Sequence, residues 1–418
     1  MRRALLLVSV TVLLAAAVTI SAFAGPSGKT AGTASPGVTS TTIKLGGTFP
    51  LSGIASIYAP IPKGMDAYFK YVNSRKGPDG KKGVYGRKIV WRYYDDGYNP
   101  SQTVQFTHKL VEDDKVFAIV GSLGTEHNLA IRPYLNDRKI PQVLISTGDS
   151  AFGLEAKKFP WTIGWQPDYI SEGHVYAHWI LQNAPNAKIA VFYQNDSYGK
   201  DYLQGLEDGL GAKKSLIVSK ENYEENDTTY ASQIARQKLS GADTWVLFTT
   251  PVPTVKAMLH AKGLNWKPDT IIINSVSASD AVMHAAEDKV GKEYTNGDIS
   301  DSYLKNPPNP RYQSDKMIKK YKRIQKRFAP NSDPNDVIFY YGVAKAYDMV
   351  QLLYRAGKNP TRASLMKAAR KMNWVNPFTI KGMKVKTTGN DGFPLDQVKV
   401  IRYQSGTWSE ISQLIKGR

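Results

Sequence analysis

The chain has 418 residues, which is enough for two or three domains or for one unit made of two lobes. A content of 42% hydrophobic and 11% aromatic residues is typical of a folded globular protein and excludes a chain that is disordered throughout. The 55 lysines and arginines exceed the 36 acidic residues, and the net charge of +19 favours anionic ligands and surfaces. The absence of cysteine excludes disulfides, thiolate metal sites, a cysteine nucleophile and a lipid-modified N-terminal cysteine.

The first 24 residues have the layout of a secretory signal peptide. Met1 and two arginines precede the apolar run Ala4–Ile20, and Ala22-Phe23-Ala24 has the small-x-small spacing of a cleavage site. We therefore predict an exported protein, periplasmic or otherwise extracytoplasmic, after cleavage near Ala24. The alternative is an uncleaved membrane anchor, which is less favoured because threonines interrupt an apolar run that is short for spanning a bilayer.

Residues 25–41 are rich in Gly, Ser, Thr and Pro and are predicted to form a flexible lead-in. After them, short β-rich runs alternate with helical patterns, which is typical of parallel sheets covered by helices on both faces. The predicted strands are 43–49, 88–94, 116–120, 142–145, 188–193, 216–219, 244–248 and 270–273. The predicted helices are 63–73, 102–112, 127–136, 172–181, 200–209, 230–239, 254–261 and 280–287.

The last third of the chain has a different pattern. Long helices are predicted at 311–328, 336–356 and 362–372, followed by two antiparallel strands at 398–403 and 408–412. Earlier in the chain, Phe159–Tyr169 interrupts the strand–helix alternation about halfway along it. This break favours two βα lobes over one large sheet.

Patterns for catalysis or metal binding are weak. His174 and His178 share a helical face near Glu172, but no HExxH arrangement is present, and a structural role is favoured. The run Gly148–Gly153 lacks GxSxG spacing and is interpreted as a binding loop. No Walker A or GxGxxG motif occurs. We therefore predict no enzyme activity, no cofactor and no metal site.

The segment Lys316–Phe328 carries seven basic residues in thirteen. Met317, Tyr321, Ile324 and Phe328 fall on one helical stripe, which leaves the charges to face water. A nucleic-acid or membrane-surface role is conceivable for such a segment. A solvated helix is the preferred interpretation, and no nucleic-acid partner is predicted.

The loops that follow predicted strands are the candidate binding loops, because open α/β sheets bind ligands at the carboxyl ends of their strands. GSLGTEHN (121–128) follows the third strand, and STGDS (146–150) follows the fourth. Both combine glycine with hydroxyl side chains near a helix start, which suits a carboxylate or another small anion. NDSYGKDY (195–202) follows the fifth strand and contributes an aromatic side chain.

Five segments together resemble one known family. IKLGGTFPLSG at Ile43, YDDGYNPSQTV at Tyr94, the GSLGT and STGDS loops, and YQNDSYGKDYLQG at Tyr193 are similar to branched-chain amino-acid-type solute-binding proteins of ABC importers. The resemblance extends from Thr42 to Arg418. It implies an α/β chain with the type I periplasmic-binding-protein fold, which has two doubly wound parallel-sheet lobes and three hinge crossovers. Lobe 1 is expected at 42–166 plus 297–377, and lobe 2 at 167–296 plus 378–418.

The resemblance also implies a set of ligand contacts. A hydroxyl for the ligand carboxylate is expected after the third strand, a glycine and a hydroxyl after the fourth, a tyrosine from the second lobe and an aromatic from the first loop. In this sequence these positions are Thr125, Gly148, Ser150, Tyr198 and Tyr58.

Two positions depart from the family pattern. Thr250 lies in a stretch where an aromatic is expected, and Ser275 lies near the position expected for a glutamate that pairs with the ligand ammonium. Asp149 is the candidate substitute for that glutamate, and helix capping is its alternative role. Carboxylate recognition is therefore expected, while ammonium recognition depends on Asp149.

The function implied by the resemblance is capture of a small carboxylate-bearing solute, such as a branched-chain or related amino acid. The expected partners are the solute and the membrane permease and ATPase subunits of an ABC importer, and a monomer is expected. One alternative keeps this role for a non-amino ligand, such as an aromatic or aliphatic carboxylate or an amide. A second alternative is a ligand-binding sensor module.

Overall fold

The computed structural model describes residues 35–389 and 391–417. The predicted signal peptide, 1–24, and most of the predicted lead-in lie outside the described residues. None of the helices in the described part of the chain is both long and apolar enough to cross a membrane.

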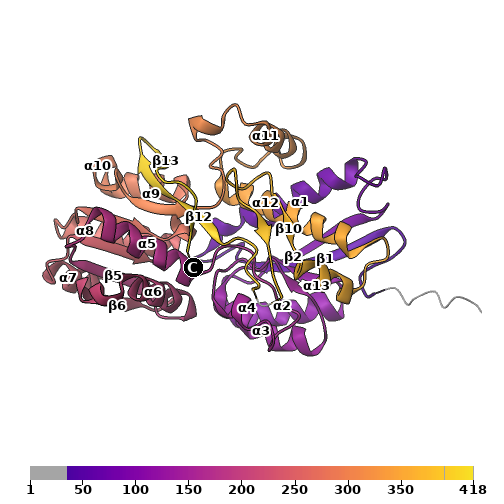
Figure 1. The fold of residues 1–418 in the computed structure, drawn as a ribbon, viewed down its shortest axis with the longest axis horizontal. Coiled ribbons are helices and arrows are strands. Elements are labelled where there is room, and N and C mark those ends of the chain that lie inside the picture. Colours follow the sequence, from indigo (N-terminus) through magenta and orange to yellow (C-terminus); the bar gives the residue numbers. More distant parts are fainter. Residues whose placement is uncertain (1–34, 390, 418) are drawn as a thin grey trace, which may run out of the picture. The chain divides into compact units, whose positions relative to one another are not determined.

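The first sheet has four parallel strands in the order β2-β1-β3-β4. Its strands are β1 (Thr42–Phe49), β2 (Lys88–Asp95), β3 (Ala118–Val120) and β4 (Gln142–Val143). The helices that pack near it are α1 (Pro60–Ser74), α2 (Pro100–Glu112), α3 (Thr125–Asp137), α11 (Lys316–Phe328), α12 (Val337–Ala356) and α13 (Arg362–Ala369). Figure 1 shows these elements with the N-terminal strands in indigo and purple.

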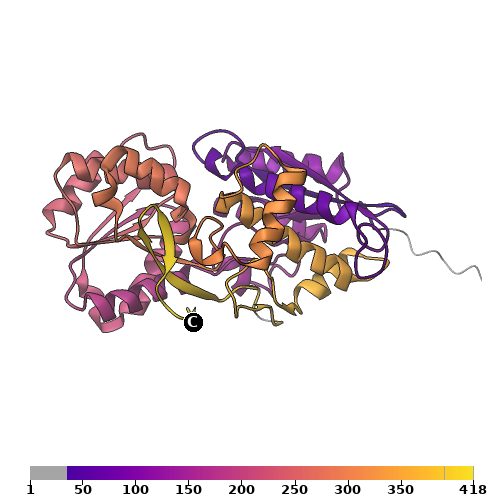
Figure 2. The ribbon, with the colours of Figure 1, turned by 90° about the horizontal axis from the view of Figure 1, so that it is seen from above.

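The second sheet has eight strands: seven follow the order β13-β12-β9-β8-β7-β5-β6, and β14 pairs with β12 outside this path. The strands from β6 to β9 are parallel, whereas β12 and β13 pair antiparallel, as Figure 2 shows for the yellow C-terminal hairpin. The strands are β5 (Ile189–Gln194), β6 (Ile217–Tyr223), β7 (Thr244–Phe248), β8 (Thr270–Ile273), β9 (Ile299–Ser302), β12 (Gln397–Gln404), β13 (Thr407–Glu410) and β14 (Ile415–Lys416). The helices of this part are α5 (Tyr169–Asn183), α6 (Ser197–Leu210), α7 (Ala231–Leu239), α8 (Pro251–Gly263), α9 (Asp280–Val290) and α10 (Lys292–Thr295).

Strand β7 shows why these strands are apolar along their whole length. All five of its residues are buried. Trp245 and Leu247 pack in one hydrophobic cluster, whereas Val246 and Phe248 pack in the other, because successive side chains point to opposite faces of a strand. A strand covered on both faces has no polar face, as is usual in parallel sheets.

The predicted strand–helix alternation is confirmed, with differences at particular ends. The strand predicted at 142–145 ends at Val143, because Leu144 has a φ of 55° and leaves the extended conformation. The helix predicted at 311–328 begins only at Lys316, where the Asp315 side chain accepts hydrogen bonds from two backbone N–H groups of the first turn.

Strand β9 was not predicted, because ISDS is short and three of its four residues are polar. It lies in the second sheet between β8 and β12, although residues 299–302 fall in the segment predicted for lobe 1. The chain then returns to the second sheet only at Gln397, after the small β10–β11 pair (Asn373–Trp374 with Val385–Lys386). The division into lobes stays a prediction.

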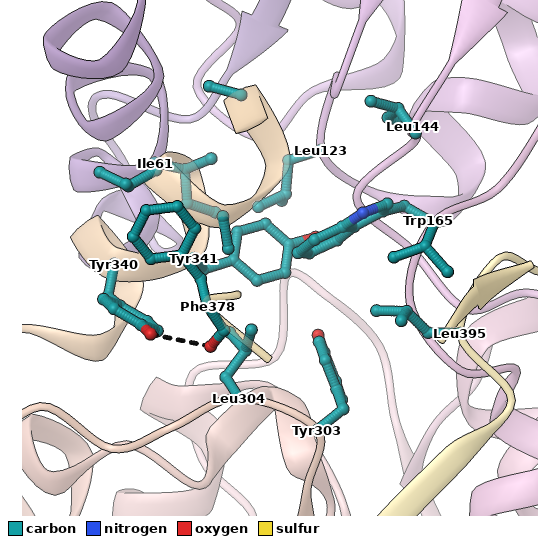
Figure 3. Packing of buried hydrophobic residues seen from close by; sticks show 14 of the residues in the cluster. Ile61, Leu123, Leu144, Trp165, Tyr303, Leu304, Tyr340, Tyr341, Phe378 and Leu395 are labelled. Atoms are coloured by element: carbon teal, nitrogen blue, oxygen red, sulfur yellow. Dashed lines mark hydrogen bonds between the residues drawn. The ribbon is translucent and has the colours of Figure 1, made fainter. Parts of the chain in front are cut away.

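The segments that connect the two sheets pack on one another. Leu304 forms an antiparallel bridge with Thr379, and Ile380 N–H donates to the Tyr303 carbonyl. Trp165 is fully buried and meets the Tyr341 ring edge-on at 4.8 Å between centroids. Figure 3 shows how these apolar side chains from distant segments gather, with Tyr340 donating to the Phe378 carbonyl.

Helices α1 and α12 cross at two glycines. A Cβ on Gly342 would lie 2.1 Å from the Ile61 carbonyl oxygen, and a Cβ on Gly64 would lie 2.1 Å from that of Phe339. The Gly342→Ala substitution is therefore expected to lower the free energy of unfolding by about 1–3 kcal/mol, because helix backbones must separate to admit the methyl group. Urea denaturation measures the change.

Gly263 supplies the matched control for this substitution. It ends helix α8, and a Cβ there would meet nothing within 4 Å. Gly263→Ala should leave the stability unchanged or slightly higher. Equal stability of the two variants would contradict the close approach of α1 and α12.

Candidate functional site

A cavity of about 120 Å³ lies where the strands of both sheets end. Leu123 to Thr125 follow β3, Ser146 and Thr147 follow β4, and Thr250 follows β7. The other lining residues come from strand β9, from the loops after β1, β2, β4, β8 and β9 and from helices α1, α5, α6 and α12: Tyr58, Ile61, Tyr98, Gln166, Tyr169, Tyr198, Ser275, Val276, Ala278, Ser279, Asp301, Ser302, Tyr303, Leu304, Val337, Ile338 and Tyr341. This position is the one expected for a ligand of an open α/β sheet.

Most of the cavity wall is aromatic or aliphatic. Six tyrosines line it, together with leucine, isoleucine and valine side chains. Tyr98 has a φ of 61°, and its ring lies 4.4 Å from that of His127, a buried neighbour. Tyr58 donates to the Val276 carbonyl at 2.9 Å and so joins loops of the two sheets across the cavity. Such a wall suits a ligand that is mostly apolar or aromatic and has a few polar atoms.

One end of the cavity is lined by hydroxyl groups. The Thr125 and Thr147 hydroxyls lie 2.6 Å apart, and Ser146 stands beside Thr147 in the chain. Thr125 is the first residue of α3, so backbone N–H groups of the first helical turn face this end. Hydroxyls and a helix N-terminus together favour an anionic group over a cation.

A buried lysine stands behind the hydroxyl end. The Lys345 ammonium donates to the Ser146 hydroxyl and, at 2.8 Å, to the Tyr341 hydroxyl. The side chain is fully buried, and burial lowers its pKa well below the usual value. Lys345 does not line the cavity, but it contacts two residues that do. Its signal in the sequence was a lone lysine inside the apolar helix α12, four residues after Tyr341.

Asp301 is the one acidic residue among those that line the cavity. Tyr176 donates to it, and the Glu172 carboxyl stands next to it with a hydrogen bond from Tyr202 at 2.7 Å. Burial, together with the neighbouring Asp301 carboxylate, raises the pKa of Glu172 well above its usual range. Burial therefore favours the protonated form of Glu172 and leaves Asp301 as the more acidic of the two carboxyls. The acid lies on β9, the strand that the sequence pattern did not predict.

The structure places five of the eight predicted site residues on the cavity wall: Tyr58, Thr125, Tyr198, Thr250 and Ser275. Tyr198 accepts a hydrogen bond from Asn274, and Thr250 lies 3.3 Å from the Tyr223 hydroxyl.

Gly148, Asp149 and Ser150 do not line the cavity. A Cβ on Gly148 would lie 2.3 Å from the Pro167 carbonyl, so this glycine permits close packing of two loops. Asp149 accepts from the Ser197 hydroxyl and from the N–H of Ala151, the first residue of the short helix α4 (Ala151–Leu154). These hydrogen bonds turn the loop after β4 toward helix α6 and away from the cavity.

Ser150 joins this loop to α6. Its N–H and its hydroxyl both donate to Asp201, at 2.6 Å and 3.2 Å. Burial and the nearby Asp149 carboxylate raise the pKa of Asp201 to about 7. Burial also raises the pKa of two other carboxyls, to about 6 for Asp196 and to about 7 for Glu225. These groups therefore ionise at a higher pH than exposed carboxyls do.

The Asp201 carboxyl should make the stability depend on pH. Its folded pKa of about 7 exceeds the ordinary value of 3.8, so protonation stabilises the folded state, and this contribution is lost as the pH rises through 7. We expect the free energy of unfolding to fall by roughly 2 kcal/mol between about pH 5.5 and about pH 8 through this group, mostly below pH 7. Urea denaturation of Asp201→Asn should show a flatter pH dependence. An identical flattening in Asp269→Asn, which removes an exposed carboxylate, would contradict this assignment.

His174 and His178, the histidine pair for which a structural role was favoured over metal binding, have different surroundings. His174 Nδ1 contacts the Gly417 carbonyl at 3.1 Å, and His178 is exposed. Among the described residues, no group of three or more His, Cys, Asp or Glu side chains is placed to hold a metal ion.

Comparison with known proteins gives one family match that covers most of the chain. The sequence profile described as "Periplasmic binding protein" matches residues 42–407. A leucine-specific-binding protein of Salmonella typhimurium is 24% identical over 213 residues, which cover 51% of this chain and 57% of that protein. The match thus spans little more than half the length of that relative.

Solved structures are similar over a larger part of the chain. A fatty acid ABC transporter substrate-binding protein from Thermomonospora curvata has a TM-score of 0.77 at 21% identity and covers 92% of this chain and 94% of its own. A solute-binding protein from R. palustris in complex with 4-hydroxybenzoate has a TM-score of 0.74 at 19% identity, covering 90% and 97%. At these identities the likeness concerns the fold.

Proposed function

Because the chain belongs to the periplasmic binding protein family, we propose that it captures a small carboxylate outside the cytoplasm and delivers it to an ABC importer. The type I periplasmic-binding-protein fold expected from the sequence is confirmed by the two strand–helix sheets and by the similar solved structures. The two similar solved structures are binding proteins for different solutes, so the shared fold does not specify the ligand, and the cavity of this chain does.

One observation indicates the chemical class of the ligand. The cavity has hydroxyl groups at one end, and the rest of its wall is mostly aromatic and aliphatic. Thr125, Ser146 and Thr147 stand at the start of helix α3, with the Lys345 ammonium behind them. A carboxylate at this end accepts hydrogen bonds from hydroxyl and N–H donors, and the positive lysine offsets its charge. The ligand that fits is a carboxylate with an aromatic or branched aliphatic body.

An amino acid is the second candidate, and Asp301 is the observation that favours it. The Asp301 carboxyl stands at the cavity wall and in its ionised form can pair with an ammonium group. Tyr176 already donates to Asp301, and Tyr202 donates to Glu172. An ammonium group of the ligand would add one charged contact to these hydrogen bonds. Asp149, the acid expected for this purpose from the sequence, stands outside the lining.

A calorimetric series separates the two candidates. Leucine and its deaminated analogue isocaproate differ by the ammonium group, and 4-hydroxybenzoate tests an aromatic body. At a ligand concentration a hundredfold above Kd, binding raises the free energy of unfolding by about 2.7 kcal/mol. A thermal-shift screen of small carboxylates should therefore first show at least one compound that clearly raises the melting temperature.

The outcomes distinguish the candidates as follows. Tighter binding of isocaproate or 4-hydroxybenzoate than of leucine supports the non-amino carboxylate. Tighter binding of leucine, lost in Asp301→Asn, supports the amino acid. Turnover of any hit compound, or the absence of any carboxylate hit, would contradict the proposed function.

The remaining parts of the proposal concern partners and location. A separate permease and ATPase would receive the solute, the protein would act as a monomer, and cleavage near Ala24 would release it. The family to which the chain belongs implies an extracytoplasmic location and a binding function. Mass spectrometry of the secreted protein tests the cleavage position, and light scattering tests the monomer.

A further inference from the structure

A second concavity, of about 360 Å³, lies between the C-terminal end of α1 and helix α11. It shares no residue with the solute cavity, so the two can be occupied independently. Its lining residues are Tyr71, Ser74, Arg75, Lys320, Arg323, Ile324, Arg327 and Phe328. We call this concavity the basic pocket.

The charges of the basic pocket are all positive. Arg75, Lys320, Arg323 and Arg327 line it, and no acidic residue does. Across the described residues, none of these four forms an ion pair with a carboxylate. Every charged residue of α11 is basic, and Asp315, which caps the helix, is already paired with Lys305 at 2.9 Å. The pocket therefore concentrates positive charge that nothing within the described chain neutralises.

The cations are held over aromatic rings. The Arg75 guanidinium carbon lies 5.1 Å from the centre of the Tyr71 ring and the Lys320 ammonium 5.4 Å from it, and Arg327 lies 5.2 Å from Phe328. Contacts of this kind restrict long side chains that would otherwise rotate freely. Three of the four cationic groups are thus placed around one hollow before a ligand arrives, which reduces the entropy cost of binding.

Helix electrostatics explain only part of this arrangement. Basic residues stabilise the last turn of a helix, and in α11 that applies to Lys326 and Arg327. Lys320 and Arg323 lie before the last turn, and Arg75 follows the end of α1. The helix dipole therefore does not explain why Lys320, Arg323 and Arg75 line the same pocket.

We propose that the basic pocket binds phosphate groups of an anionic phospholipid surface. Arginine pairs with phosphate through two parallel hydrogen bonds, and the pocket offers three guanidinium groups. Lys316, Lys319 and Lys326 are exposed on the same helix outside the pocket, so the positive face extends well beyond the area of a single small anion. An extended basic face with aromatic side chains fits a charged membrane surface better than it fits one free phosphate.

The test compares vesicle binding by the full chain and two double variants. Arg323→Gln with Arg327→Gln removes two pocket cations, whereas Lys289→Gln with Lys292→Gln removes the same charge from exposed sites on α9 and α10. Co-sedimentation is measured with vesicles of equal parts phosphatidylglycerol and phosphatidylcholine and with phosphatidylcholine vesicles alone. Since each basic residue near such a surface contributes about a fivefold factor, the pocket variant should bind phosphatidylglycerol vesicles roughly 25-fold more weakly.

The expected result is a loss in the pocket variant, near-native binding in the control variant, and weak binding of all three proteins to phosphatidylcholine alone. An equal loss in both variants would show that net charge suffices and would overturn the proposal. Thermal stabilisation by pyrophosphate without vesicle binding would assign the pocket to a free phosphate compound and would also overturn it. Circular dichroism melting of the variants verifies that both are folded.

Discussion

Replacing Lys345 by methionine is expected to weaken carboxylate binding by about 10- to 100-fold without lowering the stability of the protein. The Lys345 ammonium contacts Ser146 and Tyr341, which line the hydroxyl end of the cavity. Methionine matches the length of the lysine stem and removes a fully buried amino group. The Ser146 and Tyr341 hydroxyls keep their own hydrogen bonds, to the Gly121 carbonyl and to Gln166, so no donor is left without a partner, and the affinity and the stability should change independently.

A carboxylate and its amide distinguish this effect from a change of shape. Calorimetry on Lys345→Met should show the loss for a carboxylate that binds the native chain and little change for the corresponding amide. Lys289→Met, an exposed position, is the control variant for net charge. An equal loss for carboxylate and amide would show that Lys345 acts only by supporting the wall.

The same lysine should link solute binding to protons. Burial lowers the pKa of Lys345, and a carboxylate bound nearby would raise it again, so binding should take up protons. The affinity should therefore fall as the pH rises. Calorimetry in buffers of different ionisation enthalpy measures the uptake, which should vanish in Lys345→Met.

Replacing Asp348 by alanine is expected to lower the free energy of unfolding by about 3–5 kcal/mol. The Asp348 carboxylate is fully buried and accepts hydrogen bonds from Trp165, Trp374 and Asn376 at 2.7–2.9 Å. The donors come from two separate segments, and without the carboxylate the Trp165 and Trp374 N–H groups lose their partner, whereas Asn376 keeps the Ala344 carbonyl. Figure 3 shows Trp165 in the apolar surroundings that make this loss costly.

Asp348→Asn is the matched comparison. An amide of the same shape retains one acceptor oxygen and should cost about 1–3 kcal/mol, less than the alanine variant. Urea denaturation of the three proteins measures both differences. A smaller loss in the alanine variant than in the asparagine variant would show that the three donors find other partners, and would refute the role assigned to the carboxylate.

The sequence by itself determined the fold class and the position of the binding edge. Apolar runs of strand length alternating with helical stripes are local signals, and parallel strands covered by helices are their usual outcome. Because the carboxyl ends of parallel strands share one edge, the loops after β3 and β4 could be predicted to face a ligand, and Thr125 lines the cavity as expected.

The tertiary structure decided which other groups reach the cavity. Lys345 stands 199 residues after Ser146, and Asp301 stands 125 residues after its donor Tyr176. Contacts across such distances depend on how α12 and β9 pack, and no local period in the sequence reports that packing. For the same reason Asp149 and Ser150 were predicted to face the ligand and instead bind Ser197 and Asp201. Partners on another element, 48 and 51 residues away, determine where their side chains point.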